Sequence, residues 1–263
     1  TTALLGAQQL PGKAPDAVFF DLFGLTTVTY GPGLGWVMLA LAAAGLGFAL
    51  RGESAGEAGR GALRMAGLIA VAGLILTLLN KLSLAPGKPN YYDRLAAIPQ
   101  LELMALYGAA ASALLVFGGW RAARGGRVGA VLPLLALGLA AQWLAPTAAY
   151  VVTIPVLLSA LVLALDAYGR ARWAARASAV LVTGYMLALG HQLMQGVGPT
   201  MPGAAALPLA LAMASLLPVW AAIPRKRALA AGGAFLLAGL AVALWVRLDA
   251  PADTIAAYAD NKS

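Results

Sequence analysis

The chain has 263 residues, of which 61% are hydrophobic and only 11% are charged. A soluble domain usually carries roughly 25% charged residues, so this composition excludes an ordinary soluble protein and is typical of one embedded in lipid. The net charge of +8 does not indicate nucleic-acid binding, because the basic residues flank apolar stretches, where anionic lipid headgroups are the natural partner. The absence of cysteine excludes disulfide bonds and thiolate metal sites.

Residues 1–32 form the first predicted region, an extracytosolic segment ahead of the first apolar span. Residues 1–15 are polar and contain glycine and proline, without the features of a signal peptide. The aromatic-rich stretch 18–23 fits either a segment lying in the membrane interface or the beginning of the first helix. We expect no β structure, since nothing resembles the alternating strands of a membrane barrel.

Residues 33–247 form the second predicted region, a transmembrane domain. A hydrocarbon core about 30 Å thick requires a helix of about 20 apolar residues. Two long charge-free stretches contain proline-bearing turns and therefore supply two spans each. The predicted spans are 34–50, 62–82, 103–120, two within 128–165, two within 177–224 and 228–246. The sequence thus predicts an all-α, polytopic bundle of about eight transmembrane helices, followed by a polar extracytosolic tail at 248–263.

The basic residues recur in every second loop, which sets the predicted orientation. Twelve of the 18 lie in four trios: Arg51, Arg60 and Arg64; Arg121, Arg124 and Arg127; Arg170, Arg172 and Arg176; Arg225, Lys226 and Arg227. The other six are Lys13, Lys81, Lys88, Arg94, Arg247 and Lys262. Because cytosolic loops carry the excess of Lys and Arg, we expect both termini on the opposite side, which is the periplasmic or extracellular side of a bacterial inner membrane.

Five polar side chains stand at the predicted outer ends of the spans. They are Glu102, Gln142, His191, Gln192 and Gln195. Polar groups at membrane depth often mark function, so these residues form a candidate polar cavity on the outer face, although structural roles near the interface would also account for them. No span carries a charge at its centre, which argues against a proton-coupled pump or a voltage sensor.

The chain offers little for catalysis or metal binding. It has one histidine and ten carboxylates, which lie mostly in loops, whereas zinc sites need several ligands at defined spacing. We therefore predict no catalytic, cofactor or metal residues in this chain. Asp166 stands four residues before Arg170, a spacing that predicts an ion pair along one helix.

Several stretches resemble one family. Residues 17–25, AVFFDLFGL, look like the junction that follows the catalytic domain in membrane-bound M28 zinc aminopeptidases, the bacterial relatives of the vacuolar membrane protease and the endoplasmic reticulum metallopeptidase. Residues 144–155, LAPTAAYVVTIP, resemble their "Pro-Gly-Ala-Ser-Tyr…Trp-Pro" helix entrance, with Thr147 replacing the glycine and Ile154 the tryptophan. Residues 216–218 also look similar.

The resemblance implies a zinc-binding peptidase domain that precedes the membrane region and faces the periplasm. The metal ligands of that domain have no counterpart here, so this chain alone would not be an enzyme. We expect a non-catalytic membrane domain that anchors such a peptidase and helps to present substrate. Its partners would be the lipid bilayer and the upstream zinc-containing domain, with homo-oligomers left open.

Two other functions remain open from the residues alone. One is a transporter or channel for a small molecule or lipid, with its site at the outer ends of the third, fourth and sixth spans. The other is a structural subunit of a larger membrane complex, which would account for the scarcity of polar sites.

Overall fold

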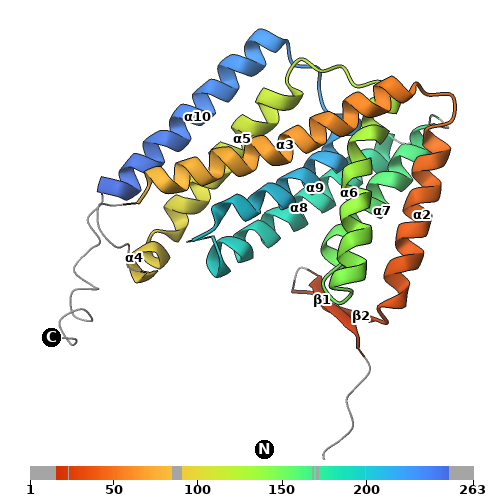
Figure 1. Cartoon of the computed structure of the whole chain (residues 1–263), viewed down its shortest axis with the longest axis horizontal. Helices are drawn as coiled ribbons and strands as arrows, with labels where there is room; N and C mark the ends of the chain where they lie inside the picture. The colour runs from red at the N-terminus through yellow and green to blue at the C-terminus, as the bar shows by residue number, and fades with distance from the viewer. Residues whose placement is uncertain are drawn as a thin grey trace, which may run out of the picture.

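A computed structural model of the chain describes residues 16–22, 24–84, 91–167, 169, 172–198 and 200–248. It is a bundle of apolar helices with a small β-hairpin at one end (Figure 1). In chain order the helices are α2 (Gly33–Ala49), α3 (Ala55–Leu82), α4 (Tyr91–Ala96), α5 (Ile98–Phe117), α6 (Arg124–Leu144), α7 (Tyr150–Asp166), α8 (Arg172–Gly196), η1 (Pro202–Ala205), α9 (Ala206–Leu216), η2 (Leu217–Val219) and α10 (Arg225–Leu248). The predicted tails at 1–15 and 249–263 lie outside the described residues.

Among the residues that the structure describes, six segments are long and apolar enough to cross a membrane. They are α3, α5, α6, α8, α10 and the continuous segment Pro202–Val219, which joins η1, α9 and η2. Helices α2 and α7 are also apolar but have only 17 residues each. The chain is therefore a mainly helical, multi-pass membrane protein.

The β-hairpin corrects two predictions. Strands β1 (Val18–Leu22) and β2 (Thr26–Tyr30) pair antiparallel, with Val18 opposite Tyr30 and Phe20 opposite Val28. The turn between them uses Gly24 at φ +72°, a conformation that costs glycine little. The stretch from residue 18 is thus not the beginning of the first helix, and the expectation of no β structure was wrong. β-Branched and aromatic residues on both sides of a glycine turn favour this hairpin.

One face of the hairpin packs against the helix ends. The ring of Phe20 stacks on that of Tyr150, at the beginning of α7, with centroids 4.7 Å apart. Phe20 also meets Tyr185 of α8 edge-on, at 6.5 Å. Phe19 points the other way and is 70% exposed, whereas Val18 is buried. The alternation of a strand thus gives the hairpin one docked face and one free face.

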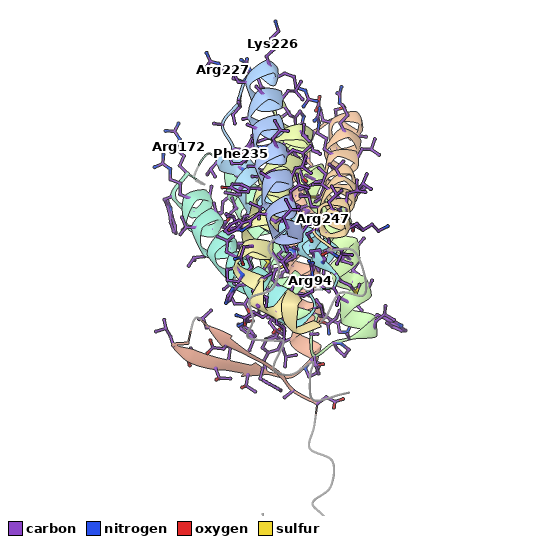
Figure 2. The ribbon with its side chains drawn as sticks, turned by 90° about the vertical axis from the view of Figure 1, so that its left-hand side faces the viewer. Arg94, Arg172, Lys226, Arg227, Phe235 and Arg247 are labelled. Carbon is purple, nitrogen blue, oxygen red and sulfur yellow. The ribbon has the colours of Figure 1, made fainter. Side chains whose placement is uncertain are left out.

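The basic segments gather at the end of the bundle opposite the hairpin. Arg124, which begins α6, pairs with Glu53 of the loop before α3 at 2.7 Å. Arg225, which begins α10, donates to the carbonyl of Gly118, just after α5, at 2.9 Å. Figure 2 shows Lys226 and Arg227 at one end of the molecule and the hairpin across the other.

Asp166, at the end of α7, also contributes to this basic end. Its Oδ2 lies 2.9 Å from a guanidinium nitrogen of Arg127, on α6. The ion pair therefore joins two helices. Arg170, the partner expected from the spacing along the chain, lies outside the described residues.

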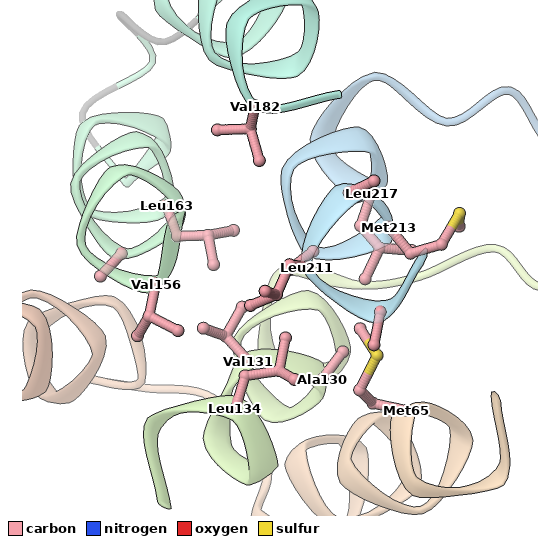
Figure 3. Close-up of a cluster of buried hydrophobic side chains, with 14 of the residues drawn as sticks. Met65, Ala130, Val131, Leu134, Val156, Leu163, Val182, Leu211, Met213 and Leu217 are labelled. Atoms are coloured by element: carbon pink, nitrogen blue, oxygen red, sulfur yellow. The ribbon is translucent and has the colours of Figure 1, made fainter. Parts of the chain in front are cut away.

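The centre of the bundle is the segment that contains α9. The span Pro202–Val219 has 56% of its length buried inside the bundle, more than any other candidate span. Figure 3 shows Leu211 of α9 against Val131 of α6, with Leu134 of α6 and Val156 of α7 in the same buried cluster. The main core therefore lies between α9 and the helices around it.

Helices α3 and α6 approach each other closely at a glycine. A Cβ added to Gly129 would lie 1.9 Å from the carbonyl oxygen of Ala58, so only glycine fits there. Small residues allow this backbone contact where lipid gives no hydrophobic drive to association.

Candidate functional site

Two of the five predicted polar residues meet at the end of the bundle that carries the hairpin. Glu102 lies in the second turn of α5, and His191 lies near the end of α8. Glu102 Oε1 is 2.6 Å from His191 Nδ1, with the side chains 24% and 54% exposed. A carboxylate stabilises the beginning of a helix when it lies in the first turn, and Glu102 lies beyond that turn of α5. Its clearest contact is therefore with the imidazole of His191.

Gln195 extends this contact along α8. Its Nε2 lies 2.9 Å from His191 Nε2, one helical turn away. The imidazole of His191 thus has a carboxylate oxygen beside Nδ1 and an amide nitrogen beside Nε2. Residues 102, 191 and 195 therefore form a polar relay that ties α5 to α8.

The relay does not have the ligands of a metal centre. Glu102 and His191 supply one carboxylate and one imidazole, and no group of three or more such ligands occurs among the described residues. Structural and catalytic zinc sites use three or four protein ligands. We therefore assign no metal chemistry to this pair.

The other two predicted residues lie elsewhere. Gln192 is exposed on α8, and its side chain makes no hydrogen bond or ion pair within the described part of the chain. Gln142 is 3% exposed near the end of α6, and its Nε2 donates to the carbonyl of Pro32 at 2.9 Å. The structure thus brings together three of the five residues.

Gln142 belongs to a separate cleft between the beginning of α2 and the end of α6. The cleft has a volume of about 360 Å³, and its lining consists of Pro32, Gly33, Trp36, Gln142, Trp143 and Pro146. The rings of Trp36 and Trp143 meet nearly at right angles, with centroids 6.5 Å apart. Sequence reasoning missed this pair, although both tryptophans stand at the predicted outer ends of their spans.

A buried arginine at the same end was also missed. Arg94 of α4 is 6% exposed, and it donates to Ser83 Oγ at 2.9 Å and to Asn80 Oδ1, both at the end of α3. Burial lowers the pKa of the Arg94 guanidinium from its ordinary value. Nothing in the local sequence indicates that an arginine in a polar loop is buried. The sequence analysis therefore counted Arg94 only as one of the six basic residues outside the four trios.

Comparison of this chain with known protein families, curated proteins and solved structures finds no match.

Proposed function

We propose that this chain is the membrane domain of a longer protein and that it anchors an extracytosolic M28-type zinc aminopeptidase. The sequence resemblance at residues 17–25 and 144–155 supports the family. The zinc and the catalytic residues would belong to the domain ahead of β1. This chain would hold that domain at the bilayer and help to present substrate to it.

The observation that carries the proposal is the position of the hairpin. It is docked through Phe20 and Tyr150 at the end opposite the arginine-rich loops. The positive-inside rule puts those loops in the cytosol, so the hairpin would lie outside. A domain joined ahead of β1 would then emerge on the extracytosolic face, close to a packed support.

This orientation needs all eight apolar segments to cross the bilayer. The 17 residues of α2 and α7 rise about 25 Å each, a little less than a hydrocarbon core of about 30 Å. Local thinning of the bilayer and snorkelling of flanking residues accommodate such a difference at modest cost. An even number of crossings returns the end of α10 to the side of the hairpin.

Single cysteines test the orientation cleanly, because the chain has none of its own. We expect Thr27→Cys, exposed on β2, to react with a membrane-impermeant maleimide in intact spheroplasts. Ala222→Cys, exposed in the loop before α10, should react only after the membrane is permeabilised. The reverse pattern, or labelling of both sites without permeabilisation, would contradict the orientation.

The peptidase assignment has its own test, in the coding sequence upstream of Thr1. Protein that includes that sequence should release N-terminal residues from peptides and lose this activity to a zinc chelator, whereas residues 1–263 alone should be inactive. An upstream region without a peptidase sequence would contradict the assignment and leave the orientation untouched.

The polar relay favours transport of a small molecule as a second candidate. Residues 102, 191 and 195 offer a carboxylate, an imidazole and an amide in contact at one end of the bundle. Transport predicts substrate flux in proteoliposomes that Glu102→Gln reduces, while Glu57→Gln at the basic end does not. Equal flux in both variants and in protein-free vesicles would rule it out.

A further inference from the structure

The cleft between α2 and α6 is lined by a hydrogen-bond acceptor for which the described residues supply no donor. Gln142 is 3% exposed, and its Nε2 is engaged by the Pro32 carbonyl. Its Oε1 sits over Gly35, and no donor from the described residues contacts this oxygen. Gln142 lines the cleft, so this oxygen can accept a hydrogen bond from a donor that enters it.

The tryptophans add two faces that favour a cation. Trp36 is 42% and Trp143 is 79% exposed, and their rings stand at 78° to each other. A cation held against an indole face is attracted by the ring quadrupole. The lining contains no Lys or Arg that would repel such a cation, and Gln142 Oε1 is an acceptor. The cleft is therefore complementary to an ammonium group.

The surroundings of the cleft indicate that the ammonium belongs to a lipid. Val37 and Leu41 of α2 and Leu139 of α6 are 52%, 55% and 43% exposed, and they lie further from the helix ends than the two tryptophans, toward the middle of the bilayer. Tryptophan is enriched at the level of the headgroups in membrane proteins. An acyl chain would lie along these apolar side chains while its headgroup entered the cleft.

We propose that the cleft binds the ammonium headgroup of an aminophospholipid, for which phosphatidylethanolamine is the probe. The headgroup nitrogen would donate to Gln142 Oε1 and rest against Trp36 and Trp143. This proposal needs only the bilayer, so it stands apart from the peptidase assignment.

The test measures lipid affinity of the full chain in detergent by native mass spectrometry. Trp143→Ala should weaken phosphatidylethanolamine binding about fivefold, the size of one cation–π contact. The matched control is Trp173→Ala, because Trp173 is 75% exposed but lies at the beginning of α8, at the basic end. This control should leave phosphatidylethanolamine affinity unchanged. Thermal unfolding verifies that both variants keep the fold.

Phosphatidylglycerol with the same acyl chains separates headgroup recognition from general lipid contact. Its binding should be the same in wild type and Trp143→Ala. The proposal is overturned if Trp143→Ala leaves phosphatidylethanolamine affinity unchanged, if it weakens both lipids equally, or if Trp173→Ala has the same effect.

Soluble phosphoethanolamine separates a lipid ligand from a free amine. We expect it not to displace the lipid even at millimolar concentration, because it lacks the acyl chains that the exposed leucines would contact. Displacement at concentrations comparable to those of the lipid would show that the headgroup alone is the ligand and would overturn the lipid assignment.

Discussion

Gln142 and Pro32 are 110 residues apart in the chain, yet the amide Nε2 of Gln142 donates to the Pro32 carbonyl at 2.9 Å. This hydrogen bond joins the end of α6 to the beginning of α2. It holds the Gln142 side chain directly over Gly35, where an added Cβ would lie 2.0 Å from Oε1. The absence of a side chain at residue 35 is therefore a condition for the contact.

Gly35→Ala should destabilise the protein by about 1–3 kcal/mol, the usual cost of overpacking a filled site. The control is Gly47→Ala on the same helix, where an added Cβ meets nothing within 4 Å. That change should be neutral or stabilise α2 by up to about 1 kcal/mol. Thermal unfolding in detergent compares the two, and equal midpoints would show that Gln142 does not occupy this position.

The Arg127–Asp166 ion pair should couple α6 to α7. Its side chains are 19% and 32% exposed, so we expect a coupling energy of about 1 kcal/mol, the upper part of the range for accessible pairs. A double-mutant cycle with Arg127→Met and Asp166→Asn measures it. The Glu57–Arg60 pair, 31% and 66% exposed along one helix, should give only about 0.3 kcal/mol. A coupling at α6–α7 no larger than this would contradict the packing described here.

Phe20 should hold the hairpin on the bundle. Phe20→Ala removes the stack on Tyr150 and the edge contact with Tyr185, and such ring pairs contribute about 0.5–1.5 kcal/mol beyond their area. We expect faster hydrogen exchange across residues 18–30. Phe19→Ala, on the exposed face of the same strand, should change little. If the two variants exchange alike, the hairpin is not anchored through its Phe20 face.

Arg94 should stabilise the packing of α4 on α3. Arg94→Ala leaves Asn80 Oδ1 and Ser83 Oγ without this donor, and a buried polar group left unsatisfied costs about 1–3 kcal/mol. Arg247→Ala, exposed near the end of α10, should stay within about 0.5 kcal/mol. The thermal unfolding midpoints of the two variants test this. Equal decreases in midpoint would show that Arg94 acts only through its charge and that its buried contacts add no stability.

Some features followed from local sequence, and others needed the fold. A membrane span needs a continuous run of apolar residues, which is a local property of the sequence. The charge-free stretches therefore predicted where most helices lie. The hairpin was missed because residues 22–50 carry no charge, and charge counting does not separate strand from helix there. Alternating apolar residues around Gly24 were the available signal.

The contacts between polar side chains show most clearly which features follow from local sequence and which need the fold. The local sequence did not indicate the ion pair between Asp166 and Arg127, which forms because α6 and α7 lie side by side. The sequence also grouped Gln142 with Glu102 and His191, whereas only the latter two meet. By itself the sequence determined a helical membrane chain with its arginines in alternate loops, because burial in lipid constrains every residue of a span. Only the tertiary structure decided which polar side chains touch, because those contacts depend on helix neighbours and rotations that apolar composition leaves free.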